Sequence, residues 1–212
     1  METTHQMNSE TESNQTKSVE NILNFRDELL AREILSCGIG KSDKILHFGS
    51  GFSDSLFFSY LSDLKSQNLV PDLSVKYSAV DVEVGCLDKI TELNSRLENP
   101  IDVELHNKSM QSFLDDNNAD YEWTIITGIF NKNLYGENQF QFIDKMIAES
   151  IKISNEGVVF TFDIQDENDD SYSIQHIISY IDSVYTRYRI SRINEKNYVI
   201  CINKYFHSII PQ

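Results

Sequence analysis

Two runs of apolar residues in this chain end in residue types that could bind a nucleoside. The first run leads into His47-Phe48-Gly49-Ser50-Gly51, where two glycines let the chain turn tightly and let a ligand approach the backbone without a Cβ clash. The second run ends in Asp81. A carboxylate at such a place can accept both hydroxyls of an adenosine ribose. The alternatives are an ordinary strand-to-helix turn for the glycines and a helix-capping carboxylate for Asp81.

Two further runs end in residues that could complete such a site. After the third run, Asn107-Lys108-Ser109-Met110 could read an adenine edge, with Met110 packed on the ring; a helix cap at Asn107 or Ser109 is the alternative. The fourth run ends in Thr127-Gly128-Ile129-Phe130-Asn131. Gly128 among bulky neighbours indicates a close backbone approach. Asn131 would lie where a transferred group meets its acceptor, unless the segment is only a β-bulge followed by a turn.

Histidine is the natural candidate for a general base, because its ordinary pKa lies near neutral pH. His47 and His106 both fall at strand ends, so we predict them, with Asn131, as catalytic residues, although histidines also occur there for packing. The five histidines show no HExxH spacing, and Cys37, Cys86 and Cys201 show no CxxC spacing. The sequence therefore predicts neither a metal site nor a disulfide framework.

Alternating helical and strand patterns must position these residues. Apolar spacing predicts a first helix from Ser18 to Gly38 and a second around residues 56–64. Strands are predicted over 44–48, 75–82, 101–105, 123–130 and 157–164, with helices over 84–97, 109–116, 140–153 and 171–184. The last two β-rich runs, 185–193 and 198–204, have no helix between them and predict an antiparallel hairpin.

This order predicts an α/β fold with a doubly wound, mainly parallel seven-stranded sheet, closed by an antiparallel C-terminal β-hairpin. Ligands bind such sheets beyond the carboxyl ends of the strands, where the strand order reverses. Residues 1–17 are polar and without periodicity, so we expect a disordered N-terminal tail. Residues 18–212 then form one domain.

The segments ILHFGSG, YSAVDV, YEWTIITGIFN, EGVVFTFDI, YRISRI and YVICINK, in this order, resemble class I S-adenosylmethionine-dependent methyltransferases over residues 18–206. The GIFN stretch and the hairpin are similar to those of a small bacterial-type group. The resemblance implies a Rossmann-like methyltransferase fold, S-adenosylmethionine as cofactor and methyl transfer to a small-molecule acceptor. It places the cofactor's carboxypropyl end against Gly49–Gly51 and its ribose on Asp81. The predicted cofactor-binding residues are His47, Gly49, Ser50, Gly51, Phe52, Asp81, Val82, Ser109, Met110 and Gly128.

Two residues depart from the pattern of that family. His47 stands where the family usually has Asp or Glu, and Ser53 replaces the third glycine of its loop. A protonated His47 would repel the ammonium and sulfonium of the cofactor, whereas a neutral one could accept a hydrogen bond. These departures motivate the alternative function, a non-catalytic methyltransferase-fold domain that acts as a binding or interaction module.

The charge balance narrows the possible partners. The chain has 18 Lys+Arg and 33 Asp+Glu, a formal net charge of −15, which argues against nucleic acid and against an anionic membrane surface. Five acidic residues after the fifth strand favour a cationic acceptor, unless they only solvate a loop: Asp163, Asp166, Glu167, Asp169 and Asp170. The hairpin is locally basic, which suits an acidic partner or guards an edge strand. With no signal peptide or membrane span, we expect a cytoplasmic protein; the oligomeric state stays open.

Overall fold

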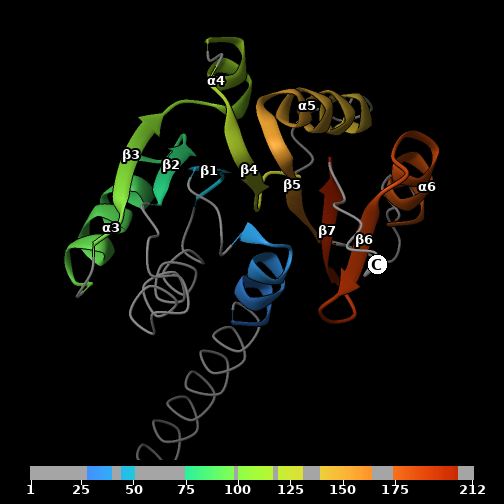
Figure 1. Cartoon of the computed structure of the whole chain (residues 1–212), viewed down its shortest axis with the longest axis horizontal. Helices are drawn as coiled ribbons and strands as arrows, with labels where there is room; N and C mark the ends of the chain where they lie inside the picture. The colour runs from blue at the N-terminus through green and yellow to red at the C-terminus, as the bar shows by residue number, and fades with distance from the viewer. Residues whose placement is uncertain are drawn as a thin grey trace, which may run out of the picture.

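The computed structural model describes residues 28–39, 44–50, 75–97, 100–116, 119–130, 139–163 and 174–204. They form a seven-stranded sheet in the order β3-β2-β1-β4-β5-β7-β6 (Figure 1). The strands are β1 (Lys44–Phe48), β2 (Lys76–Asp81), β3 (Asp102–Asn107), β4 (Tyr121–Ile126), β5 (Ser154–Asp163), β6 (Tyr188–Arg192) and β7 (Asn197–Asn203). The helices are a segment of residues 28–36 and α3 (Val84–Ser95), α4 (Met110–Asp116), α5 (Gln139–Ile153) and α6 (Ile174–Val184).

The sheet confirms the predicted fold class. Strands β1 to β5 pair in parallel, and β7 pairs antiparallel with both β5 and β6. The strand order reverses at β1, which lies between β2 and β4. Because consecutive strands run outward from β1 in both directions, this reversal opens a crevice at the carboxyl ends of β1 and β4.

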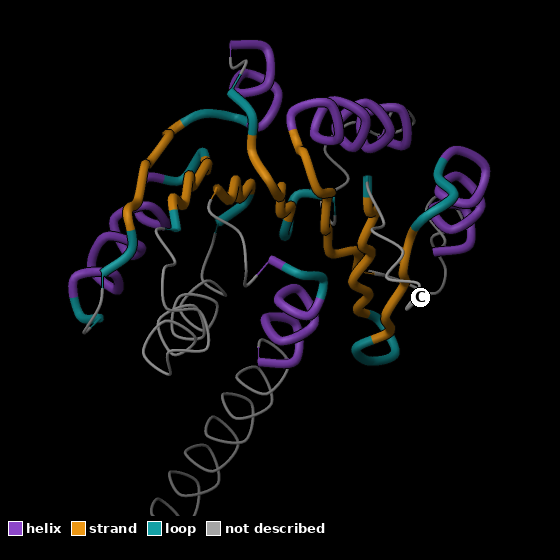
Figure 2. Tube along the Cα trace, in the orientation of Figure 1, coloured by secondary structure: helices purple, strands orange, loops and turns teal. Residues whose placement is uncertain are grey.

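Helices cover both faces of the sheet (Figures 1 and 2). On one face the helix of residues 28–36 and α3 bury Ile34, Leu87 and Ile90 against strand residues such as Ile45. On the other face α4, α5 and α6 pack against residues such as Phe48. Alternate β1 side chains therefore enter separate cores, and its Ile45, Leu46 and Phe48 are all completely buried. A strand buried on both sides reads as a continuous apolar run, which is why its sequence predicted it well.

Several strand boundaries differ from the prediction, and those of β4 and β5 have an identifiable cause. β4 was expected over residues 123–130, but the chain leaves the sheet after Ile126, before the left-handed turn at Gly128 (φ +66°). β5 was expected from Gly157 but begins at Ser154. The Ser154 hydroxyl donates to the Ser150 carbonyl and bonds Thr124 Oγ1 at 2.7 Å. These polar contacts join helix and strand directly, and no apolar pattern could predict them.

Other predictions lie wholly or partly outside the described residues. The expected tail of residues 1–17 and the helix around 56–64 fall there, as does the first part of the helix expected from Ser18 to Gly38. The described end of that helix stops before Gly38, which has a φ of +106°, as its sequence predicts. Within the described ranges, no helix combines the length and apolar character needed to cross a membrane.

Candidate functional site

The predicted site residues that the structure describes lie along the carboxyl edge of the parallel strands. Phe48, the last residue of β1, pairs with Val80 on one side and Ile126 on the other. Asp81 pairs with Asn107 at the end of β3. The turns after β1, β2, β3 and β4 therefore share one edge, with the end of β1 at its centre.

Gly49 makes the turn after β1 in a space that no other residue fits. Its φ is +71°, and a Cβ there would lie 2.0 Å from the Thr127 carbonyl oxygen and 2.9 Å from Ile129 Cγ1. The Gly49 N–H donates to the Val80 carbonyl, and the Thr127 N–H donates to the Phe48 carbonyl, each over 3.0 Å. The glycine turn is thus fixed between the ends of β2 and β4.

Gly128 has a backbone conformation that favours glycine. No described atom lies within 4 Å of where its Cβ would be, so no described part of the chain makes the close backbone approach expected there. That approach occurs instead at Gly49. Gly128 is needed for its φ of +66°, which L side chains rarely adopt. Its N–H donates to Thr161 Oγ1 over 3.3 Å, and the space beside its Cα is open.

His47 is part of a buried chain of hydrogen bonds that crosses three strands. Its Nδ1 lies 2.5 Å from Tyr77 Oη, and its Nε2 lies 2.7 Å from Thr127 Oγ1. The Thr127 hydroxyl donates to the Gly49 carbonyl over 2.9 Å. Because a hydroxyl has one proton to donate, Thr127 accepts from His47 Nε2–H, and neutral His47 accepts from Tyr77 at Nδ1. The chain therefore runs from Tyr77 through His47 and Thr127 to the Gly49 carbonyl.

Burial keeps His47 uncharged. The residue is 2 % exposed, and desolvation lowers the pKa of its imidazole to about 3. A neutral His47 does not repel a cationic ligand, which resolves the two cases left open by the sequence. A group with such a low pKa is also a weak base at neutral pH. The structure therefore favours a role in holding the Gly49 turn over a role in proton transfer.

Asp81 ends β2 with its carboxylate directed into a local turn. Its Oδ1 accepts the Glu83 N–H over 2.9 Å, and the N-cap of α3 is Glu83, not Asp81. No hydrogen bond to Asp81 Oδ2 occurs among the described residues. Val82 follows with 65 % of its surface exposed. The end of β2 thus offers a carboxylate oxygen beside an exposed apolar side chain.

The segment after β3 is mainly structural. Ser109 Oγ accepts the Ser112 N–H over 3.1 Å and so caps α4, as the alternative interpretation predicts. The Asn107 side chain donates to the carbonyls of Asp81 and Val82. Met110 is 5 % exposed and packs in the core, which leaves little of its surface for a ligand.

His106 and Ser50 carry buried polar atoms at this edge. The His106 ring packs edge-on against Phe113, and its Nε2 lies 3.5 Å from Glu104 Oε1. That distance allows an ion pair when the ring is protonated but makes no hydrogen bond. Ser50 is completely buried, and its hydroxyl has no hydrogen-bond partner within the described part of the chain.

Several predicted site residues cannot be placed. Gly51, Phe52 and Asn131 lie outside the described residues, as does Ser53. Of the acidic cluster after β5, only Asp163 is described, and its Oδ1 accepts from the Asn197 side chain. No three His, Cys, Asp or Glu side chains in the described ranges are grouped as metal ligands.

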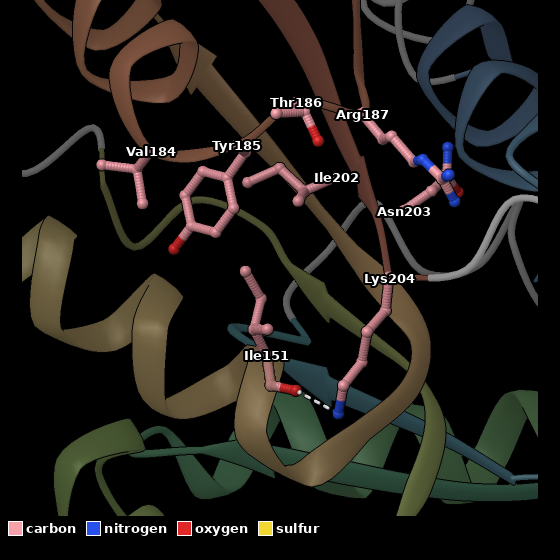
Figure 3. A pocket seen from close by; sticks show the side chains of 8 residues that line it. All are labelled: Ile151, Val184, Tyr185, Thr186, Arg187, Ile202, Asn203 and Lys204. Carbon is pink, nitrogen blue, oxygen red and sulfur yellow. Dashed lines mark hydrogen bonds between the residues drawn. The ribbon is translucent and has the colours of Figure 1, made fainter.

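A cavity of about 360 Å³ lies at the opposite edge of the sheet, near the start of β5 (Figure 3). The ends of α5, α6 and the hairpin enclose it, with these lining residues: Ile151, Val184, Tyr185, Thr186, Arg187, Ile202, Asn203 and Lys204. The Lys204 ammonium donates to the carbonyls of Ile151 and Ser154, so this basic side chain caps α5. The cavity is remote from the predicted cofactor site.

Sequence reasoning missed Tyr77, and it named Thr127 only as part of the segment that ends the fourth strand, with no role of its own. The only signal was indirect: a histidine inside an apolar strand needs buried hydrogen-bond partners, and neighbouring strands must supply them. Which residues supply them depends on the register, in which His47 lies beside Ala79 and Ile45 beside Tyr77.

Comparison with known proteins tests the fold as a whole. No protein-family model matches the chain, and no curated protein sequence matches it either. Solved structures do match it. Magnesium protoporphyrin IX methyltransferase from Synechocystis PCC 6803, with bound SAH, has a TM-score of 0.52 at 8 % identity, over 86 % of this chain and 84 % of that one.

Two other solved structures show the same likeness. The bifunctional kinase-methyltransferase WbdD has a TM-score of 0.55 at 13 % identity, over 88 % of this chain but 39 % of that one. SMU.1697c from Streptococcus mutans, in complex with SAH, has a TM-score of 0.50 at 15 % identity, over 80 % of this chain and 95 % of that one. At these identities the likeness establishes a Rossmann-like methyltransferase fold; activity has to be argued from the site.

Proposed function

We propose that the carboxyl edge of this sheet binds S-adenosylmethionine and transfers its methyl group to a small-molecule acceptor. The observation that carries the proposal is the Gly49 turn, fixed at the point where the strand order reverses, with the Asp81 carboxylate one strand away. A nucleoside with a charged tail suits this pair, because the tail can lie along the turn while the ribose reaches the carboxylate.

The residues at the edge fit this cofactor. The buried Ser50 hydroxyl lacks a partner in the described structure, and such a group costs about 1–3 kcal/mol until a ligand or water satisfies it. Asp81 Oδ2 can accept a ribose hydroxyl, and exposed Val82 offers an apolar contact for a base. Gly51 and Phe52 remain predicted contacts, as do Ser109, Met110 and Gly128.

In this proposal His47 is a positioning residue. S-adenosylmethionine supplies a methyl group on a sulfonium leaving group, so the protein mainly has to align the acceptor with it. Neutral His47 adds no positive charge beside that sulfonium. Through Thr127 it holds the Gly49 carbonyl in one orientation. An acid at this position would act by charge, whereas His47 acts by geometry.

The acceptor side rests on the sequence alone. His106 lies on β3, three strand spacings from β4, which is about 14 Å at the usual spacing. A base at that distance could reach an acceptor at β4 only across a large substrate. Asn131, which follows β4 in the sequence, remains a predicted catalytic residue. A cationic small molecule remains the predicted acceptor, and a cytoplasmic location remains a prediction.

Calorimetry with S-adenosylmethionine and its demethylated product tests the proposal directly. We expect saturable binding by the full chain. Asp81→Ala should weaken it about 10- to 100-fold, because a hydrogen bond to a charged group contributes about 1.5–3 kcal/mol. Asp81→Asn, which keeps an acceptor for the Glu83 N–H, separates ribose binding from turn stability. Asp102→Ala is the matched control, because its exposed carboxylate lies at the amino end of β3.

Three outcomes decide between the functions. Absence of binding to either compound at millimolar concentrations would refute the proposal. Binding without release of demethylated cofactor, against a panel of oxygen and nitrogen acceptors, would support the non-catalytic module. Turnover that Asp81→Ala abolishes and Asp102→Ala leaves intact would establish the enzyme.

A further inference from the structure

A polar cluster lies between the helix of residues 28–36 and the β-hairpin. It plays no part in the proposed function. It joins Glu33 and Cys37, from the end of that helix, to Arg189 on β6 and Cys201 on β7. Arg189 and Cys201 are directly opposite each other in the antiparallel pair, so their side chains project from the same face.

One nitrogen of Arg189 organises the cluster. Its Nη2 lies 2.8 Å from Glu33 Oε1, 2.6 Å from Ser36 Oγ and 3.1 Å from Cys37 Sγ. Ser191, two residues along β6, donates to the same Glu33 oxygen over 2.5 Å. The guanidinium is therefore fixed against the Cys37 sulfur by contacts on both sides.

Cys37 and Cys201 are free thiols next to Arg189, whose guanidinium contacts the Cys37 sulfur and which pairs with Cys201 across the two strands. Cys37 is partly exposed and packs against the core cluster that holds buried Cys201. The Cys37 thiol donates to the Glu33 carbonyl over 3.4 Å, and the Cys201 thiol donates to Asn203 Oδ1 over 3.7 Å. Contact with Cys201 and the charge of Arg189 lower the pKa of Cys37, although burial and Glu33 oppose this. The same contact raises the pKa of Cys201, which keeps its proton. Cys37 is thus the better nucleophile and Cys201 its protonated neighbour.

From this geometry we propose that Cys37 is a modification site for hydroperoxides, with Cys201 as the resolving thiol. The Cys37 sulfur attacks one peroxide oxygen, the O–O bond breaks, and Cys37 becomes a sulfenic acid as the peroxide leaves as water or an alcohol. The Cys201 sulfur then attacks the Cys37 sulfur, an S–S bond forms, and water leaves with the sulfenic oxygen. Overall, two thiols are oxidised to a disulfide and one peroxide is reduced.

The product would cross-link segments that are distant in sequence. A Cys37–Cys201 bond would tie the helix of residues 28–36 to the hairpin, across 201 − 37 = 164 positions. It would leave the carboxyl edge of the sheet untouched. The proposal therefore stands or falls independently of the proposed function.

Peroxide treatment of the full chain, followed by alkylation and mass spectrometry, tests the site. We expect the wild type to lose two hydrogens, with Cys37 and Cys201 linked and Cys86 still alkylated. In Cys201→Ser, dimedone should trap a sulfenic acid on Cys37. In Cys37→Ser, neither remaining cysteine should form a dimedone adduct. Oxidation of Cys86 first, or a stable Cys37 sulfenic acid in the wild type, would overturn the proposal.

Arginine variants test the cause of the reactivity. Arg189→Gln should slow alkylation of Cys37 at neutral pH several-fold, because losing the guanidinium charge removes one cause of the lowered thiol pKa and leaves less thiolate. Arg189→Lys, which keeps a charge, should recover part of the rate. Arg192→Gln is the matched control, because Arg192 lies on the same strand and donates to the Asn194 carbonyl instead. Equal rates in Arg189→Gln and Arg192→Gln would refute the role of Arg189, and circular dichroism would confirm folding of each variant.

Discussion

Replacing His47 with Gln should change how the stability of the protein depends on pH. The folded protein holds the pKa of His47 at about 3, whereas the ordinary value is 6.5. Above about pH 6.5 both folded and unfolded chains carry a neutral imidazole, so its titration contributes nothing. Below that pH the unfolded chain binds a proton that the folded chain does not, and the free energy of unfolding falls until about pH 3.

The size of the effect follows from the shift. Between pH 6.5 and 5 the titration of His47 should lower the free energy of unfolding of the wild type by about 2 kcal/mol, at about 1.4 kcal/mol per pH unit. Glutamine cannot titrate, so this contribution to the pH dependence of the free energy of unfolding is absent in His47→Gln. It also breaks part of the hydrogen-bond chain, which should cost about 1–3 kcal/mol at pH 7.5. The stability difference between the two proteins should therefore shrink by about 2 kcal/mol as the pH falls from 7.5 to 5.

Urea unfolding followed by circular dichroism at both pH values measures this difference. Carboxylates and the other histidines also titrate, but they are common to both proteins and cancel. His176→Gln is the matched control, because it makes the same replacement at an exposed position on α6. A constant difference between wild type and His47→Gln would show that folded His47 binds protons normally. The assignment of a buried, uncharged series of hydrogen bonds from Tyr77 to Gly49 would then be incorrect.

Four further substitutions test the backbone and the helix capping in and near the site. Gly49→Ala should prevent folding or cost more than about 3 kcal/mol, whereas Gly128→Ala, with open space but a positive φ, should cost about 1–2 kcal/mol; thermal melts compare the two. Gly85→Ala, in the first turn of α3 with nothing within 4 Å of the new Cβ, should stabilise the protein by about 0.4–1 kcal/mol in urea titrations. Ser109→Ala should cost about 1 kcal/mol, because it removes the α4 cap, and hydrogen exchange should show faster opening of that helix.

Much of the fold could be predicted because its strands are buried on both faces. An apolar run such as β1 has few alternatives to a central strand, and its predicted and observed bounds coincide at Lys44–Phe48. The hairpin was predictable for a topological reason, since no helix fits between β6 and β7 to carry a parallel crossover. The strand ends were harder, because polar contacts such as Ser154 to Thr124 decide where β5 begins.

The sequence alone determined that polar and glycine residues end the parallel strands, and therefore which residues share one edge of the sheet. Only the tertiary structure decided what each of them contacts. It showed that, among the described residues, a neighbouring backbone approaches Gly49 closely but not Gly128, and that burial keeps His47 neutral between Tyr77 and Thr127. It also brought Cys37 and Cys201, which look unrelated in sequence, to the same arginine, Arg189. The reason is physical: periodicity records which face of an element is apolar, whereas pKa values and hydrogen bonds depend on neighbours that strand register and helix packing supply.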